Sequence, residues 1–221
     1  MTEIERKLND IFSEIASGND RGEKITLLGA TKFVPVERVN EAISAGLEAI
    51  GENHAQELRD KFPFYLPCEK HFIGTLQKNK LKYVVGKADC IDSISGIDLA
   101  AAINEKALSL NVYQSVMLEI NAGEEFSKTG ASIKAAKPLY KSIIGLKNIK
   151  LTGVMAMLPE GITDNEKADL CKAVREFYDE IREETPTVKT LSLGMSGDYK
   201  IAIKNGSNMI RLGRAIFGER I

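Results

Sequence analysis

Cysteine is scarce in this sequence. The 221 residues include only Cys68, Cys90 and Cys171, which lie far apart and form no CxxC pair or other metal-ligand spacing. Three scattered thiols do not make a disulfide framework, and a structural zinc site needs closely spaced ligands. We therefore expect reduced, buried thiols in a cytoplasmic protein, and no bound metal.

An excess of charge and a long hydrophobic run are also missing. The 30 basic and 31 acidic residues nearly cancel, which leaves a formal net charge of −1. No basic stretch with interleaved aromatic residues supports a nucleic-acid partner. The first residues, MTEIERKLNDIFSEIA, are charged and amphipathic, without the continuous apolar core of a signal peptide or a membrane span. We expect no membrane partner.

The common glycine-rich phosphate-binding motifs do not occur. The chain contains neither GxGxxG nor GxxxxGK, and its first apolar run ends in Gly-Ala-Thr-Lys. An open, doubly wound sheet usually carries such a fingerprint after its first strand, so that fold is the less favoured alternative. Since no linker or low-complexity tract interrupts the chain, residues 1–221 are expected to form one domain.

Eight short apolar or β-branched runs are present, and each is expected to form a β-strand. They are Ile25–Ala30, Ala49–Gly51, His71–Ile73, Cys90–Ile94, Ser115–Ile120, Leu151–Met157, Thr190–Gly194 and Met209–Leu212. Segments with helical spacing separate them, most clearly Asn165–Glu184. Strand and helix in alternation give a parallel sheet covered by helices. Eight repeats after an extra N-terminal helix predict an α/β fold, a single (β/α)8 TIM barrel.

Proline interrupts one of the helical segments. Ser132–Ile144 contains Pro138, which has no N–H to donate within a helix. We expect two short helical pieces here, the second beginning at the proline.

Polar residues at the carboxyl ends of the strands are the functional candidates of such a barrel. Lys32 ends the apolar run Ile-Thr-Leu-Leu-Gly-Ala-Thr. A lysine there is costly unless it is paired or is a neutral, reactive amine, and the free amine attacks carbonyl groups. The alternatives are that Lys32 extends to solvent or pairs with a carboxylate such as Glu52.

The last two predicted strands are followed by a candidate anion site. Ser196-Gly197-Asp198 precedes a predicted helix, and Arg211-Leu212-Gly213-Arg214 ends the eighth run. A hydroxyl, backbone N–H groups and a glycine suit an anion, and these loops form the usual phosphate site of such barrels. The glycines could instead serve simple tight turns. His71, in the third run, suits either a hydrogen-bonded core histidine or a ligand contact.

Five ordered blocks give the chain a family resemblance. They are Ala30–Lys32 with Val34–Glu37; Ile50–Asn53 with Gln56–Glu57; His71–Gly74 with Leu76–Gln77 and Asn79–Lys80; Leu191–Asp198; and Arg211–Gly213 with Ala215–Gly218. In these blocks the chain resembles the YggS/PROSC pyridoxal phosphate homeostasis proteins, which are similar to the barrel domain of alanine racemase. The resemblance covers essentially the whole chain.

The resemblance implies a role for each candidate residue. Lys32 would hold pyridoxal 5'-phosphate (PLP) as a Schiff base, and Arg211 would face the pyridine nitrogen. The other implied cofactor-binding residues are Ser196, Gly197, Gly213 and Arg214 for the phosphate, and Asn53 and His71 beside the cofactor.

Three positions depart from the commoner family pattern. Arg214 stands where Ser or Thr is usual, so a hydroxyl contact to the phosphate is in doubt there. Phe33 replaces a small polar residue, and the pair His54-Ala55 also differs.

Two classes of function follow from the resemblance. The first is a protein that stores, buffers or delivers PLP inside the cell, with apo PLP enzymes as candidate partners. The alternative is a PLP-dependent enzyme similar to an amino-acid racemase. An arginine facing the ring nitrogen leaves it unprotonated and the ring a weaker electron sink. Racemisation by two bases also needs an acid or base on the face of the cofactor opposite Lys32. In alanine racemases a tyrosine from a separate domain supplies it, and no such residue is evident in this sequence. We therefore expect no catalytic residue, and a monomer or weak dimer.

Overall fold

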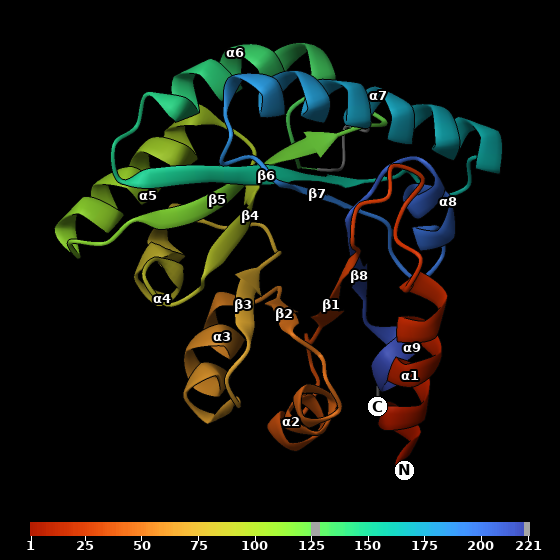
Figure 1. Cartoon of the computed structure of the whole chain (residues 1–221). Coiled ribbons are helices and arrows are strands. Elements are labelled where there is room, and N and C mark those ends of the chain that lie inside the picture. The colour runs from red at the N-terminus through yellow and green to blue at the C-terminus, as the bar shows by residue number, and fades with distance from the viewer. Residues whose placement is uncertain (125–128, 219–221) are drawn as a thin grey trace.

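The computed structural model describes residues 1–124 and 129–218. Its eight parallel strands form a closed barrel in chain order, with β1 hydrogen-bonded to both β2 and β8 (Figure 1). The strands are β1 (Thr26–Ala30), β2 (Ala49–Glu52), β3 (Glu69–Phe72), β4 (Cys90–Ile94), β5 (Gln114–Asn121), β6 (Ile149–Met157), β7 (Thr190–Leu193) and β8 (Met209–Leu212). The predicted (β/α)8 barrel is confirmed.

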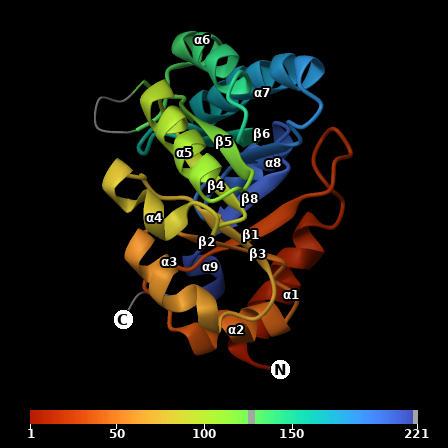
Figure 2. The same ribbon diagram turned by 90° about the vertical axis from the view of Figure 1, so that its left-hand side faces the viewer.

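Helices cover the outside of the barrel (Figure 2). They are α2 (Val36–Ser44), α3 (Ala55–Lys61), α4 (Leu81–Val84), α5 (Ile97–Ser109), α6 (Ile133–Ile144), α7 (Asp164–Glu184), α8 (Tyr199–Lys204) and α9 (Arg214–Phe217), with 3-10 turns at Phe62–Phe64 and Lys78–Lys80. Each longer helix buries one apolar stripe against the strands, as in α7, where Cys171, Val174 and Tyr178 are fully covered. None of the helices in the described ranges is long and apolar enough to span a membrane.

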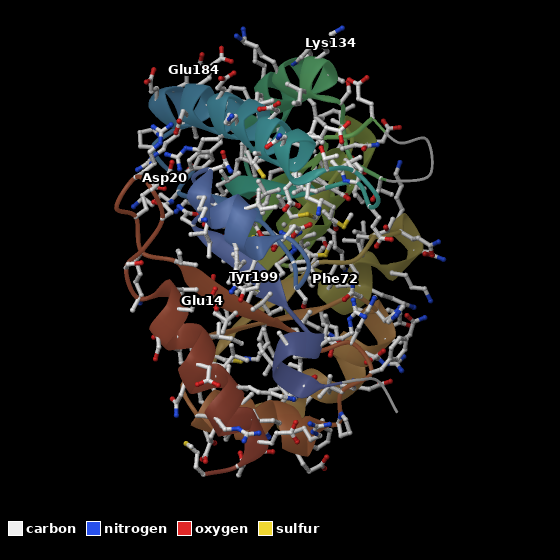
Figure 3. The ribbon with its side chains drawn as sticks, turned by 90° about the vertical axis from the view of Figure 1, so that its right-hand side faces the viewer. Glu14, Asp20, Phe72, Lys134, Glu184 and Tyr199 are labelled. Carbon is white, nitrogen blue, oxygen red and sulfur yellow. The ribbon has the colours of Figure 1, made fainter. Side chains whose placement is uncertain are left out.

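The extra N-terminal helix, α1 (Glu3–Ile15), packs against α2 and α9. Thr2 begins it with a capping box, in which Thr2 and Glu5 satisfy each other's backbone N–H groups. At its other end, the Tyr199 hydroxyl donates to Glu14 Oε2 at 3.0 Å and joins α8 to α1 (Figure 3). Helix α1 therefore contacts helices from the first and from the last part of the barrel.

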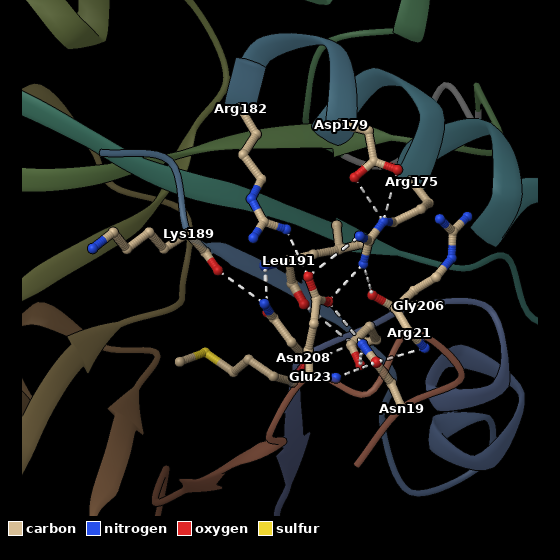
Figure 4. A network of polar contacts seen from close by, with 12 residues as sticks. Asn19, Arg21, Glu23, Arg175, Asp179, Arg182, Lys189, Leu191, Gly206 and Asn208 are labelled. Carbon is tan, nitrogen blue, oxygen red and sulfur yellow. Dashed lines mark hydrogen bonds and ion pairs between the residues drawn. The ribbon is translucent and has the colours of Figure 1, made fainter. Parts of the chain in front are cut away.

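A polar network connects the loop before β1 to α7 and to the loop before β8 (Figure 4). The Arg175 guanidinium donates to Glu23 Oε2 at 2.8 Å and to the Gly206 carbonyl at 2.6 Å. Arg182 donates to the other oxygen of Glu23 at 2.6 Å, and Asn19 also donates to Glu23. Burial raises the pKa of Glu23, but these hydrogen bonds outweigh it and lower the pKa to about 2.

The prediction of two helical pieces around Pro138 is wrong, because α6 runs unbroken from Ile133 to Ile144. Pro138 and Lys134 both lie on the exposed side of this helix. Water can therefore bind the Lys134 carbonyl, which loses its helical N–H partner. The buried side of α6, with Ala136, Tyr140 and Ile143, keeps its packing.

Candidate ligand-binding site

A cavity of about 480 Å³ lies at the carboxyl ends of the strands. Its size is within the ordinary range for a small-molecule site. Its lining residues are Ala30, Lys32, Asn53, Ile73, Met155, Met157, Leu158, Pro159, Glu160, Gly161, Lys167, Met195, Ser196, Gly197, Asp198, Arg211, Gly213 and Arg214. The cavity therefore collects residues from both ends of the chain.

Lys32 lies two residues after the end of β1 and lines the cavity. The preceding residue, Thr31, is fully buried, and its hydroxyl donates to Glu52 Oε1 at 2.9 Å. Glu52 also accepts from the Tyr65 hydroxyl at 3.0 Å and lies 3.7 Å from Lys61 Nζ. Burial raises the pKa of Glu52. Glu52, the carboxylate that was considered as a partner for Lys32, thus has hydrogen-bond partners in Thr31 and Tyr65.

The turn after Lys32 has an unusual backbone at Phe33. Phe33 has a φ of +63°, in the left-handed region that side chains other than glycine and asparagine rarely adopt. Its N–H donates to Glu57 Oε2 at 3.0 Å, and the Val34 N–H donates to the Thr31 carbonyl at 2.9 Å. This turn holds the backbone of Lys32 between two fixed neighbours.

The turn at residues 195–198, after β7, forms another wall of the cavity. The Met195 N–H donates to the Asp198 carboxylate at 2.6 Å, and its carbonyl accepts from the Asp198 and Tyr199 N–H groups. A Cβ placed on Gly197 would meet no atom within 4 Å. The protein itself leaves this space open, so a ligand can approach the backbone of Gly197.

Two further glycines lie close to the backbone of neighbouring segments. A Cβ on Gly74 would lie 2.1 Å from the carbonyl oxygen of Asn53, so only glycine fits there. At Gly213, a Cβ would lie 3.3 Å from the Ala30 carbonyl oxygen. Gly213 therefore packs closely against the end of β1.

Arg211 enters the cavity from β8 and is almost completely buried. Its guanidinium donates to the carbonyl and hydroxyl of Ser192 at 2.8 and 2.7 Å, and to the Ala156 carbonyl at 2.9 Å. Burial lowers the pKa of Arg211, but an arginine keeps its proton in proteins. These bonds use at most three of its five N–H donors.

His71 is the one predicted site residue outside the cavity lining. It is buried inside the barrel, where its Nδ1 lies 2.8 Å from Asp92 Oδ1 and its Nε2 lies 3.2 Å from Glu69 Oε1. Burial opposes the charged imidazole, but the Asp92 charge and hydrogen bond raise the pKa of His71 well above its ordinary value. Its placement favours a core histidine over a ligand contact.

The barrel also brings Cys90 next to this pair. One donor atom from each of His71, Cys90 and Asp92 lies within 4.8 Å of the others. Burial raises the pKa of the Cys90 thiol to about 12, so this sulfur holds its proton at neutral pH. The cluster is accounted for by the His71–Asp92 ion pair. The linear spacing of the residues gave no sign of it.

The structure brings together seven of the eight predicted binding residues, Lys32, Asn53, Ser196, Gly197, Arg211, Gly213 and Arg214. Sequence reasoning missed Glu160 and Lys167, which also line the cavity. A signal for Lys167 exists, because it precedes Cys171, Val174 and Tyr178 on the inward stripe of α7. A charged residue on such a stripe faces the barrel strands and the loops at their ends.

The fold and the cavity place the chain in a known class of barrels. Residues 26–221 match the family model described as alanine racemase, N-terminal domain. An alanine racemase of Clostridium difficile has a TM-score of 0.81 at 15% identity, over 98% of this chain and 59% of the racemase. At that identity the likeness shows the fold alone.

More similar proteins narrow the class. A protein of Aquifex aeolicus named pyridoxal phosphate homeostasis protein is 38% identical over 204 residues, which cover 90% of each chain. PipY of Synechococcus elongatus, solved with PLP bound, has a TM-score of 0.85 at 25% identity, over 98% of this chain and 100% of PipY. The chain belongs to the family of pyridoxal phosphate homeostasis proteins, as the resemblance to YggS/PROSC predicted.

Proposed function

We propose that this chain binds PLP in the barrel cavity as a Schiff base on Lys32 and serves intracellular PLP homeostasis by storing, buffering or delivering the cofactor. One observation carries the proposal: Lys32, after the first strand, and the turn of Ser196 and Gly197, after the seventh, line the same cavity. The names of the Aquifex relative and of PLP-bound PipY support it.

The lining residues fit the phosphate, the aldehyde and the ring of PLP. Ser196, Gly197 and the backbone of Gly213 and Arg214 suit the phosphate, because hydroxyl and N–H donors bind phosphate oxygens. The Lys32 amine suits the aldehyde: its nitrogen forms a C=N bond with the aldehyde carbon, and the carbonyl oxygen leaves as water. Asn53 lines the same cavity and suits a contact beside the ring.

Arg211 suits the pyridine nitrogen and argues for holding the cofactor. Its remaining N–H donors can bind that nitrogen, but they cannot protonate it. An unprotonated ring withdraws electrons weakly from a bound amino acid. In addition, none of the six tyrosines, all within the described residues, lines the cavity to act as a second base. We therefore propose binding without catalytic turnover.

The remaining parts of the proposal concern the whole protein. Residues 1–221 are proposed to form one PLP-binding domain, of which residues 125–128 and 219–221 lie outside the described ranges. We propose a cytoplasmic monomer or weak dimer, with apo PLP enzymes as candidate recipients of the cofactor.

The Schiff base is tested with Lys32→Ala. Purified wild-type protein is expected to be yellow after incubation with PLP, and borohydride should fix the cofactor to a peptide containing Lys32. Lys32→Ala should lose the absorbance and keep its circular dichroism spectrum. Lys172→Ala is the control, because that lysine is 60% exposed on α7. A colourless wild-type protein, or full absorbance in Lys32→Ala, would contradict the proposal.

An assay of catalytic turnover distinguishes the alternative, a racemase-like enzyme, from a homeostasis protein. The PLP-loaded protein is incubated with a panel of L- and D-amino acids, and products are measured by chiral chromatography and keto-acid assay. The homeostasis proposal expects no product beyond one equivalent per protein. Sustained racemisation or transamination of any substrate would favour the enzyme.

A further inference from the structure

Lys167 is a second cation at the phosphate end of the cavity besides Arg214. It lies in the first turns of α7 and lines the cavity together with Ser196 and Gly197. The Lys167 side chain is only 18% exposed. Its Nζ lies 3.4 Å from Oδ1 of Asp164, whose own side chain is 81% exposed. The pair with Asp164 is therefore open to solvent and weak, whereas the lysine itself is mostly covered.

The direction of Lys167 follows from the helix. Residues 167, 171, 174 and 178 share one face of α7, and Cys171, Val174 and Tyr178 on that face are fully buried. Helix α7 packs against α8, which begins directly after the turn that contains Ser196 and Gly197. Lys167, one helical turn before Cys171, lines the cavity together with Ser196 and Gly197.

Basic side chains outnumber carboxylates among the residues that line the cavity. Four basic residues, Lys32, Lys167, Arg211 and Arg214, line it together with two carboxylates, Glu160 and Asp198. The carboxylate of Asp198 is already bound by the Met195 N–H. Moreover, a cation near the start of the 21-residue helix α7 opposes the helix dipole. A doubly charged anion would offset both effects.

We propose that the side chains of Lys167 and Arg214 bind the ligand's phosphate beside the Ser196–Gly197 turn, so that this cavity selects phosphate monoesters over their unphosphorylated counterparts. The inference rests on the proposed function, because it assumes that the cavity binds PLP. It also assigns a task to Arg214, where the family usually has Ser or Thr: a guanidinium replaces the hydroxyl contact by a charged one.

The test compares PLP with pyridoxal, which has the aldehyde and the ring but no phosphate. Lys167→Met is the main variant, since methionine keeps the length and the covering of apolar surface without the charge. Lys172→Met is the matched control: it removes a lysine of the same helix that also pairs with an aspartate three residues away but is 60% exposed. Lys167→Arg tests rescue by another cation.

Lys167→Met is expected to raise the Kd for PLP about tenfold or more, as for the loss of one charge-assisted phosphate contact. The Kd for pyridoxal should stay within about twofold of wild type. Inorganic phosphate should compete with PLP more weakly in Lys167→Met, and the affinity of the variant should depend less on salt concentration. Lys172→Met should match wild type, and Lys167→Arg should recover most of the affinity.

The outcomes distinguish the two proposals. If wild-type protein forms no Schiff base with PLP, the proposed function fails. If it does, and Lys167→Met binds PLP as tightly as wild type, the phosphate role of Lys167 is wrong. Equal losses for PLP and pyridoxal would also overturn it, because they would indicate a general packing role. Arg214→Met, which supplies neither a charge nor a hydroxyl, should lower PLP affinity further when combined with Lys167→Met; an unchanged affinity would remove Arg214 from the site.

Discussion

At the scale of single residues, the barrel interior contains an ion pair between His71 and Asp92. Both side chains are buried, and the Asp92 charge raises the pKa of His71. A histidine whose pKa is raised on folding stabilises the folded protein fully below its unfolded pKa of about 6.5. This contribution falls as the pH rises through the higher, folded pKa.

Asp92→Asn is therefore expected to destabilise the protein by about 3–5 kcal/mol near neutral pH, because it leaves a buried imidazole without its carboxylate. It should also lower the pKa of His71. Urea unfolding measures the first effect and NMR titration the second, in a chain that has only two histidines. A His71 that titrates near its ordinary value in the wild type would contradict the ion pair.

The residues that line the cavity were predictable to different degrees. Lys32 and Ser196 stand at strand ends, where a polar residue after an apolar run marks the cavity of a barrel. Lys167 belongs to a helix, and it enters the cavity only because α7 lies beside the 195–198 turn. The pairing of His71 with Asp92 depends on the register of two neighbouring strands. That register cannot be predicted from the spacing of residues along the chain.

At the scale of elements, the Glu23 network fixes the loop before β1 to α7. The pKa of Glu23 is lowered to about 2 from an ordinary value of 4.5. A carboxylate with a depressed pKa stabilises the fold above its unfolded pKa, and this contribution is lost as the pH falls from about 4.5 to about 2.

Glu23→Gln is expected to cost about 1–3 kcal/mol at pH 7, because Arg175 and Arg182 lose a shared charged partner and Arg175 keeps only Asp179 as a carboxylate partner. The free energy of unfolding, measured by urea at pH 7 and pH 3, should differ less between the two pH values in the variant than in wild type. The same pH dependence in both proteins would show that Glu23 is not the titrating group.

Element boundaries were predicted well where apolar residues alternate with turns. The strands Cys90–Ile94 and Met209–Leu212 match the structure at both ends. The error at Pro138 has a physical cause: whether a proline breaks a helix depends on which side of the helix it occupies. On the exposed side of α6 the missing hydrogen bond is replaced by water.

At the scale of the whole molecule, the closed barrel leaves no strand edge unpaired among the described residues. Removing any strand would break the ring, so we expect residues 1–221 to unfold as one cooperative unit. Calorimetry should give a single transition with equal calorimetric and van't Hoff enthalpies. Two resolved transitions would contradict the single-domain proposal.

Ring closure through β1 and β8 also affects how the protein is made. Met209 follows Ala30 by 179 positions (209 − 30), and at about 5–20 residues per second a ribosome needs roughly 10 to 35 seconds to synthesise that interval. During translation the Lys32 amine exists without the turn at Ser196 and Gly197 beside it. A nascent chain thus presents Lys32 without the rest of the cavity, and under the proposed function we expect cofactor capture to begin only after the last strand has left the ribosome.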